Sequence, residues 1–151
     1  MDNSNKTTVS QVNPSAPKSS PEEIKEKIKI ASSQKDDVDI CNLFEQLAAS
    51  SEPDHKEYKQ WGEALFNLDR CQDAEDKLKV AAQGLENQKE TVGLNEDEQS
   101  HAASLYLVLG RSLAKLGNHR DADESYTKAN DYEQKNIDIL LKWGQSLVQL
   151  K

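Results

Sequence analysis

The sequence predicts an all-α protein, a stack of antiparallel helix pairs that ends in a C-terminal capping helix. The first observation behind this prediction is an internal repeat, in which Gly62, Gly110 and Gly144 are each followed three residues later by Leu. The second is that no segment alternates apolar and polar residues as a half-buried strand does, so no sheet is expected. A repeated unit of helical spacing indicates paired helices stacked in series.

Each copy of the repeat combines bulky and small residues. The first copy contains Tyr58, Trp61, Gly62, Leu65, Ala74, Leu78 and Ala81, the second contains Tyr106, Leu109, Gly110, Leu113, Ala122, Tyr126 and Ala129, and the third begins with Leu140, Trp143, Gly144 and Leu147. A glycine inside a helix costs about 1 kcal/mol relative to alanine, so its recurrence indicates a packing role. We expect the small residues where helices cross, with each pair burying its apolar face against a neighbour.

The first third of the chain is less regular than the rest. Residues 1–19 are rich in Ser, Thr, Asn and Pro and are predicted to form a disordered arm. Ser20-Pro21-Glu22-Glu23 is a helix start, with a Ser cap, Pro in the first position and Glu three residues after the cap. Helices are expected over 21–31 and 38–49, and 20–54 is interpreted as a possible degenerate repeat.

The remaining helices follow in order. Asp54 is expected to begin a helix that runs to about Leu68, and a second helix is predicted over 72–86. Residues 87–95 interrupt the apolar period, and Asn95 then caps a long helix with Glu98 three residues later. The later helices are predicted over 96–116, 120–131 and 136–150.

This pattern resembles the tetratricopeptide repeat. The best match is 103–136. Residues 55–88 match nearly as well, although Asp69 stands where the second copy has Gly117. Residues 89–102 fall outside the period as an insertion expected to lengthen the turn and the long helix. Residues 137–151 match a first helix only, so they form either a cap with a polar face or a truncated repeat. The resemblance implies a right-handed superhelix whose concave groove binds peptides.

The resemblance also implies which residues line that groove, because the first helix of each pair lies on the concave face in this family. The predicted peptide-binding residues are Lys56, Lys59, Phe66, Leu107, Arg111, Lys115, Leu141 and Lys142. The whole stripe has five cations and two anions, Glu63 and Asp138, a balance of 5 − 2 = +3 on a chain of net charge −8. The expected partner is therefore an extended or acidic segment of another protein. The alternative is that these residues are solvated helix faces.

Members of the family that hold the acidic tail of heat-shock chaperones use a clamp of Lys, Asn and Arg residues. Lys59 and Lys142 fit this clamp, but Glu63, Val108 and Asp138 stand at its other positions. Two of these replacements are carboxylates that would repel an acidic tail. The sequence disfavours a chaperone-tail adaptor.

Composition excludes several other classes of function. Net charge is −8, from 27 acidic and 19 basic residues, whereas nucleic-acid binders need a basic excess. No apolar run approaches the roughly 20 residues of a membrane span. Cys41 and Cys71 match no metal motif and are interpreted as partly buried thiols in a reducing compartment. The expected localisation is cytoplasmic, with the nucleus as the alternative.

No catalytic constellation, metal site or cofactor motif is predicted. His55, His101 and His119 are interpreted as single residues at helix edges or turns, and the carboxylates at 96–98 as a helix start. The protein is therefore expected to be an adaptor that binds a partner peptide in its groove. The alternative is a structural subunit that docks into a larger complex through its convex face or the 89–102 insertion, because the fold hosts both functions.

Overall fold

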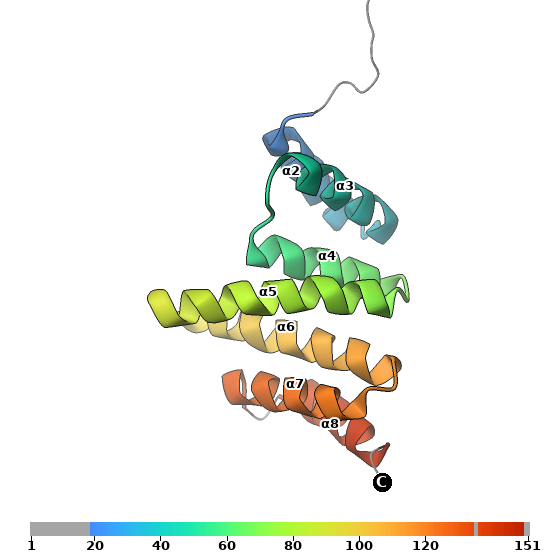
Figure 1. The fold of residues 1–151 in the computed structure, drawn as a ribbon, viewed down its shortest axis with the longest axis vertical. Helices are drawn as coiled ribbons and strands as arrows, with labels where there is room; N and C mark the ends of the chain where they lie inside the picture. The colour runs from blue at the N-terminus through green and yellow to red at the C-terminus, as the bar shows by residue number, and fades with distance from the viewer. Residues whose placement is uncertain (1–18, 135, 150–151) are drawn as a thin grey trace, which may run out of the picture.

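Helical hairpins stacked in series make up the described part of the protein. The computed structural model describes residues 19–134 and 136–149, and these contain seven helices and no strand. The helices are α2 (Pro21–Ser33), α3 (Asp37–Ser50), α4 (His55–Asn67), α5 (Cys71–Thr91), α6 (Glu96–Lys115), α7 (His119–Tyr132) and α8 (Ile137–Val148). Figure 1 shows them layered in chain order, with α2 and α8 at opposite ends. This arrangement confirms the predicted all-α, repeat-like fold.

The predicted caps start three of the helices. At α2, the Glu23 N–H donates to the Ser20 hydroxyl over 3.2 Å, and the Ser20 N–H donates to the Glu23 carboxylate over 2.9 Å. The same reciprocal pair joins Asp54 with Glu57 at α4 and Asn95 with Glu98 at α6. Each pair satisfies two N–H groups that have no partner within the helix. The arm predicted at residues 1–19 lies almost wholly outside the described residues.

One helix is longer than predicted. Helix α5 continues to Thr91 instead of ending near residue 86, so the interruption is confined to a short turn in which Gly93 has φ 81°. Gln88 explains the extension, because its side chain contacts both His55 (2.7 Å) and Glu98 (2.5 Å). The insertion therefore lengthens α5 as well as α6.

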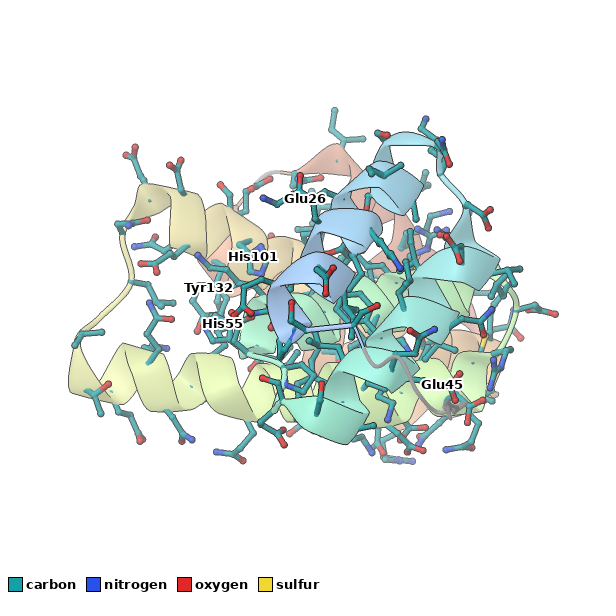
Figure 2. The ribbon with its side chains drawn as sticks, turned by 90° about the horizontal axis from the view of Figure 1, so that it is seen from above. Glu26, Glu45, His55, His101 and Tyr132 are labelled. Atoms are coloured by element: carbon teal, nitrogen blue, oxygen red, sulfur yellow. The ribbon has the colours of Figure 1, made fainter. Side chains whose placement is uncertain are left out.

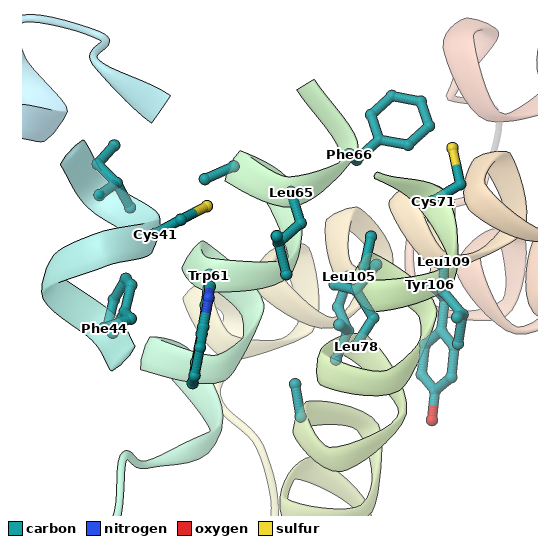
Figure 3. Close-up of a cluster of buried hydrophobic side chains, with 14 of the residues drawn as sticks. Cys41, Phe44, Trp61, Leu65, Phe66, Cys71, Leu78, Leu105, Tyr106 and Leu109 are labelled. Carbon is teal, nitrogen blue, oxygen red and sulfur yellow. The ribbon is translucent and has the colours of Figure 1, made fainter. Parts of the chain in front are cut away.

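A continuous apolar core runs through the stack. Trp61 lies 5.7 Å from the ring of Phe44 and 6.0 Å from the ring of Tyr58, both in stacked geometry, and links α3 to α4. Figure 3 shows Trp61 and Leu65 between α3 and the α5 residue Leu78. Trp61 and Leu109 are both only 5% exposed. The α2–α3 hairpin is thus packed onto the repeats.

The repeated small residues have different environments in the three copies. Ala74, Ala81, Ala122 and Ala129 are fully buried. A Cβ atom added at Gly62 would come 2.5 Å from Leu78, and one added at Gly110 would come 2.8 Å from Tyr126. Gly144 differs from the expectation that it lies at a helix crossing: no atom lies within 4 Å of a Cβ placed there, because no described helix covers that face.

Helix α8 packs on the edge of α7. Ile139 and Ser146 are buried, and the Trp143 Nε1–H donates to Asp123 of α7 over 2.5 Å. The outward face is not the polar one expected of a cap, since Ile137 and Val148 on that face are exposed. The polar residues Lys142 and Gln145 turn instead toward the inner side of the stack.

Candidate functional site

A cavity of about 290 Å³ lies where the first helices of successive pairs come together. Its lining residues come from α4, α6, α7 and α8: Phe66, Arg111, Ala114, Lys115, His119, Tyr126, Lys142, Gln145 and Ser146. Four of the eight predicted groove residues are in this set, namely Phe66, Arg111, Lys115 and Lys142. We call this feature the cationic pocket.

Two cations of the cationic pocket are held by one aromatic ring. The guanidinium of Arg111 lies 4.7 Å from the ring centre of Phe66, and the ammonium of Lys115 lies 5.3 Å from it. Phe66 itself is 8% exposed. Cation–π contacts of this geometry contribute about 0.5–1 kcal/mol at accessible sites, so they restrict the positions of both cations.

Lys142 of α8 adds a third cation to the lining. Beside it, Nδ1 of His119 and the hydroxyl of Ser146 form a hydrogen bond of 3.0 Å. Tyr126 also lines the pocket, and burial raises the pKa of its hydroxyl to about 12, while the positive charge of Arg111 acts in the other direction.

The lining of the cationic pocket contains no carboxylate within the described chain. The acidic neighbours are peripheral: Asp69 pairs with Lys115 over 3.1 Å, but both side chains are more than half exposed. Exposed pairs of this kind contribute about 0–1 kcal/mol. The contact with Asp69 therefore neutralises Lys115 only weakly.

The structure does not bring the other four predicted groove residues into the cationic pocket. Lys59 is 8% exposed, and its ammonium pairs with Glu63 of the same helix over 3.0 Å. Lys56 is exposed near the α6 N-terminus, Leu107 is half-buried against the core, and Leu141 is 53% exposed on α8. Lys59 differs most from its expected role, because Glu63 one turn later compensates its charge.

Sequence reasoning missed three lining residues, His119, Ser146 and Tyr126. The resemblance placed the groove on first helices, whereas His119 and Tyr126 are on α7, a second helix. The apolar period identified Tyr126 only as a packing residue. Its place in the pocket gave no separate signal, because a ring buried in the core and a ring that also lines a cavity have the same spacing in the sequence.

A second polar cluster lies at the other end of α6. His55 and His101, interpreted as unpaired from the sequence, have ring centres 6.4 Å apart, and Figure 2 shows them side by side. Nδ1 of His55 and Nε2 of His101 are buried without a hydrogen-bond partner in the described chain. Burial lowers the pKa of His101 to about 4, assisted by the charges of Lys59, His55 and Lys56.

The remaining reactive side chains give no further site. Cys41 and Cys71 are buried free thiols, and burial raises the pKa of Cys41 to about 11. Within residues 19–134 and 136–149, no three His, Cys, Asp or Glu side chains gather closely enough to hold a metal ion. Among the described helices, none has the length and apolar character needed to cross a membrane.

Known proteins resemble this chain in sequence and in structure. No family model matches the sequence. The DnaJ protein P58IPK homologs A and B of Oryza sativa subsp. japonica are 31% identical over 116 residues, which is 73% of this chain but 24% of each relative. The chain thus spans about a quarter of the length of these curated relatives.

Among solved structures, the Arabidopsis OM64 TPR domain superposes with a TM-score of 0.66 at 18% sequence identity, over 83% of this chain and 93% of that domain. The shared architecture and the glycine register together define a tetratricopeptide-repeat fold. This fold is typical of modules that mediate protein–protein interactions.

Proposed function

We propose that this protein is a noncatalytic interaction module that binds an acidic peptide segment of a partner protein in the groove formed by α4, α6 and α8. The observation that supports the proposal is the cationic pocket, in which Arg111, Lys115 and Lys142 surround Phe66 without a carboxylate among the lining residues. This local charge is opposite to the net charge of −8 of the whole chain.

The chemistry of the pocket favours carboxylates. The planar guanidinium of Arg111 matches a carboxylate with two parallel hydrogen bonds, and lysine ammonium groups add less directional attraction. Because Phe66 already orients Arg111 and Lys115, little side-chain freedom is lost when a ligand binds. Half-buried Leu107 is on the same helix as Arg111 and supplies apolar surface for a neighbouring ligand side chain.

The direct test is a binding titration of a short fluorescein-labelled peptide of alternating Glu and Leu with a free C-terminal carboxylate. The reference ligand replaces every Glu with Gln. Arg111→Gln and Lys142→Gln should each weaken binding of the acidic peptide by about tenfold or more, because a hydrogen bond to a charged group contributes about 1.5–3 kcal/mol. Binding should also weaken as salt is raised, since the attraction is screened.

Lys29→Gln is the matched control, because Lys29 is an exposed cation on α2 with 76% side-chain exposure. It removes the same charge from the chain without altering the pocket. Lys59 is a poor test position, because Lys59→Gln would leave Glu63 without its partner. If the Gln–Leu peptide binds as tightly as the Glu–Leu peptide, or if Lys29→Gln weakens binding as much as Arg111→Gln, the pocket does not select carboxylates.

A further inference from the structure

The hydrogen-bond donors of the cationic pocket come from three helices. They include Arg111 and Lys115 of α6, His119 of α7 and Lys142 of α8. A carboxylate offers these donors two oxygens in one plane, whereas a phosphate ester offers three terminal oxygens around a tetrahedral phosphorus atom. A set of donors that three helices supply suits the three oxygens of a phosphate better than the two of a carboxylate.

The hydrogen-bonded pair of His119 and Ser146 adds an uncharged donor to the lining. Nδ1 of the ring and the hydroxyl oxygen are 3.0 Å apart. If the hydroxyl donates to Nδ1, the neutral ring carries its proton on Nε2, and if Nδ1 donates to the hydroxyl oxygen, the hydroxyl proton is free. In either arrangement the pair retains one proton that is not used between the two side chains and can be donated to a ligand.

The amount of positive charge also favours a ligand with two negative charges. Three cations line one cavity of about 290 Å³, with no carboxylate among the lining residues that the structure describes. A phosphorylated side chain carries about −1.5 to −2 charges at pH 7, whereas a carboxylate carries one. Because Coulomb attraction is proportional to the charge of the ligand, the same three cations attract a phosphate up to twice as strongly.

Two carboxylates of the predicted groove stripe disfavour a run of acidic residues as the ligand. Glu63 of α4 and Asp138 of α8 belong to that stripe but lie outside the lining of the cationic pocket. Asp138 is exposed, and its charge acts on the lining residue Tyr126, which places it close to the pocket. A series of Glu or Asp side chains along the groove would be repelled by these two carboxylates. One phosphorylated residue would instead concentrate its charge at the cations.

We propose that the anionic group bound in the cationic pocket is a phosphorylated serine or threonine side chain of the partner protein. This inference rests on the proposed function and specifies its ligand. The guanidinium of Arg111 would donate two parallel hydrogen bonds to phosphate oxygens, and the lysines would neutralise the remaining charge. The ring of Phe66 already contacts Arg111 and Lys115, so it is not free to stack on the ring of a phosphotyrosine. Binding would thus depend on prior phosphorylation of the partner.

Binding titrations with four matched fluorescein-labelled peptides test the proposal. The peptides share uncharged flanks of Gln, Leu and Ala and have blocked ends, and their central position is Ser, Glu, Glu-Glu or phosphoserine. The Glu-Glu peptide has nearly the same total charge as the phosphoserine peptide but distributes it over two carboxylates. The phosphoserine peptide should bind at least about tenfold more tightly than the Glu-Glu peptide, and the Ser peptide should not bind measurably.

Variants and competing ions locate the phosphate. Arg111→Gln and Lys142→Gln should each weaken binding of the phosphoserine peptide by at least about tenfold, whereas the control Lys29→Gln should leave it unchanged. Inorganic phosphate should displace the bound peptide at a concentration at which acetate, at matched ionic strength, does not. The comparison of the four peptides uses the unmodified chain, so it does not depend on how well any variant folds.

The possible failures separate this inference from the proposed function. If the phosphoserine and Glu-Glu peptides bind equally and both require Arg111, the pocket selects negative charge alone, so the proposed function stands and the phosphate inference is wrong. If neither the phosphoserine peptide nor the acidic Glu–Leu peptide binds, both are wrong. If Lys29→Gln weakens binding as much as Lys142→Gln does, the phosphate is attracted to surface cations in general and not to the cationic pocket.

Discussion

The ring of Tyr126 on α7 lies so close to Gly110 on α6 that a Cβ at Gly110 would come 2.8 Å from Cε1 of the ring. Tyr126 is only 1% exposed, so the ring cannot swing into solvent to make room. The pair sets the distance between α6 and α7 next to Arg111, which directly follows Gly110 and lines the cationic pocket. Gly62 and Leu78 form the equivalent contact between α4 and α5.

Gly110→Ala should therefore destabilise the fold by about 1 kcal/mol or more. Overpacking a filled site costs about 1–3 kcal/mol, which outweighs the roughly 1 kcal/mol that alanine gains in helix propensity. Gly144→Ala is the matched comparison, because the added methyl group meets open space and should stabilise by about 0.5–1 kcal/mol. Urea unfolding at low protein concentration measures both values. Changes of the same sign in the two variants would contradict the packing difference.

Local signals in the sequence predicted most of the fold. The capping residues Ser20, Asp54 and Asn95 identify helix starts, because the side chain of each accepts a hydrogen bond from the backbone N–H of the Glu three residues later. The predicted end of α5, near residue 86, was wrong by about one turn, because the helix continues to Thr91. It depends on the contacts of Gln88 with His55 and Glu98, which are tertiary and leave no periodic trace in the sequence.

The candidate site was harder to predict than the fold. The resemblance implied which side of each first helix faces a groove, and four of the eight predicted residues, Phe66, Arg111, Lys115 and Lys142, line one cavity. Their role in binding a peptide stays a prediction. Register could not indicate that Glu63 neutralises Lys59, because a pair one turn apart is equally consistent with two solvated side chains. The adjacency of His55 and His101 could not be predicted either, since it depends on how α4 and α6, which are separated by α5 in the sequence, pack together.

His101 should make the protein less stable in mild acid. Its pKa is about 4 in the folded chain, against an ordinary value of 6.5. Between pH 4 and 6.5 the unfolded chain binds more protons at this histidine than the folded chain does. The contribution of the neutral His101 to the free energy of unfolding is therefore full above pH 6.5 and is lost as the pH falls toward 4. Partial solvent exposure screens the effect, so we expect a loss of roughly 1–2 kcal/mol by pH 4.5.

The measurement is the melting temperature of the protein between pH 7 and 4.5, together with an NMR titration of the His101 ring. His101→Leu removes the ionisable group while retaining a buried apolar side chain, and its melting temperature should vary less over this range. If the two proteins lose stability in parallel, other groups account for the acid sensitivity.

Tyr126 should produce the opposite dependence at alkaline pH. Burial raises the pKa of its hydroxyl to about 12 from the ordinary value of 10. Above pH 10 the unfolded chain loses this proton while the folded chain retains it, so the associated stability is full below pH 10 and is lost as the pH rises toward 12. Tyr126→Phe should show a shallower decline in unfolding free energy over this range.

Lysine side chains titrate in the same range, but they are shared by the two proteins and cancel in the comparison. Ultraviolet absorbance of the phenolate follows the tyrosines directly, and one late-titrating group should be absent in Tyr126→Phe. Identical alkaline profiles for the two proteins would mean that the Tyr126 hydroxyl does not have a raised pKa.

Two side-chain hydrogen bonds join α8 to α7, one between Trp143 and Asp123 and one between His119 and Ser146, and the first should be needed to hold α8 in place. Trp143 donates its indole N–H to Asp123 over 2.5 Å, and Ile139 and Ser146 are the only buried residues of α8 among its described positions. Asp123→Ala leaves the indole N–H without its partner, at a cost of about 1–3 kcal/mol. Because α8 is the last layer of the described stack, this loss should open α8 locally and leave the inner hairpins closed.

Hydrogen exchange of backbone amides distinguishes this local opening from global unfolding. In Asp123→Ala, amides of 137–148 should exchange at least about tenfold faster, while amides of α4 and α5 should keep their protection. Glu124→Ala is the control, because Glu124 is an exposed carboxylate next to Asp123 in the same helix. Unchanged exchange in 137–148 would show that the packing of Ile139 and the His119–Ser146 hydrogen bond suffice to hold α8. Faster exchange in every helix would show that α8 and the inner hairpins unfold as one unit.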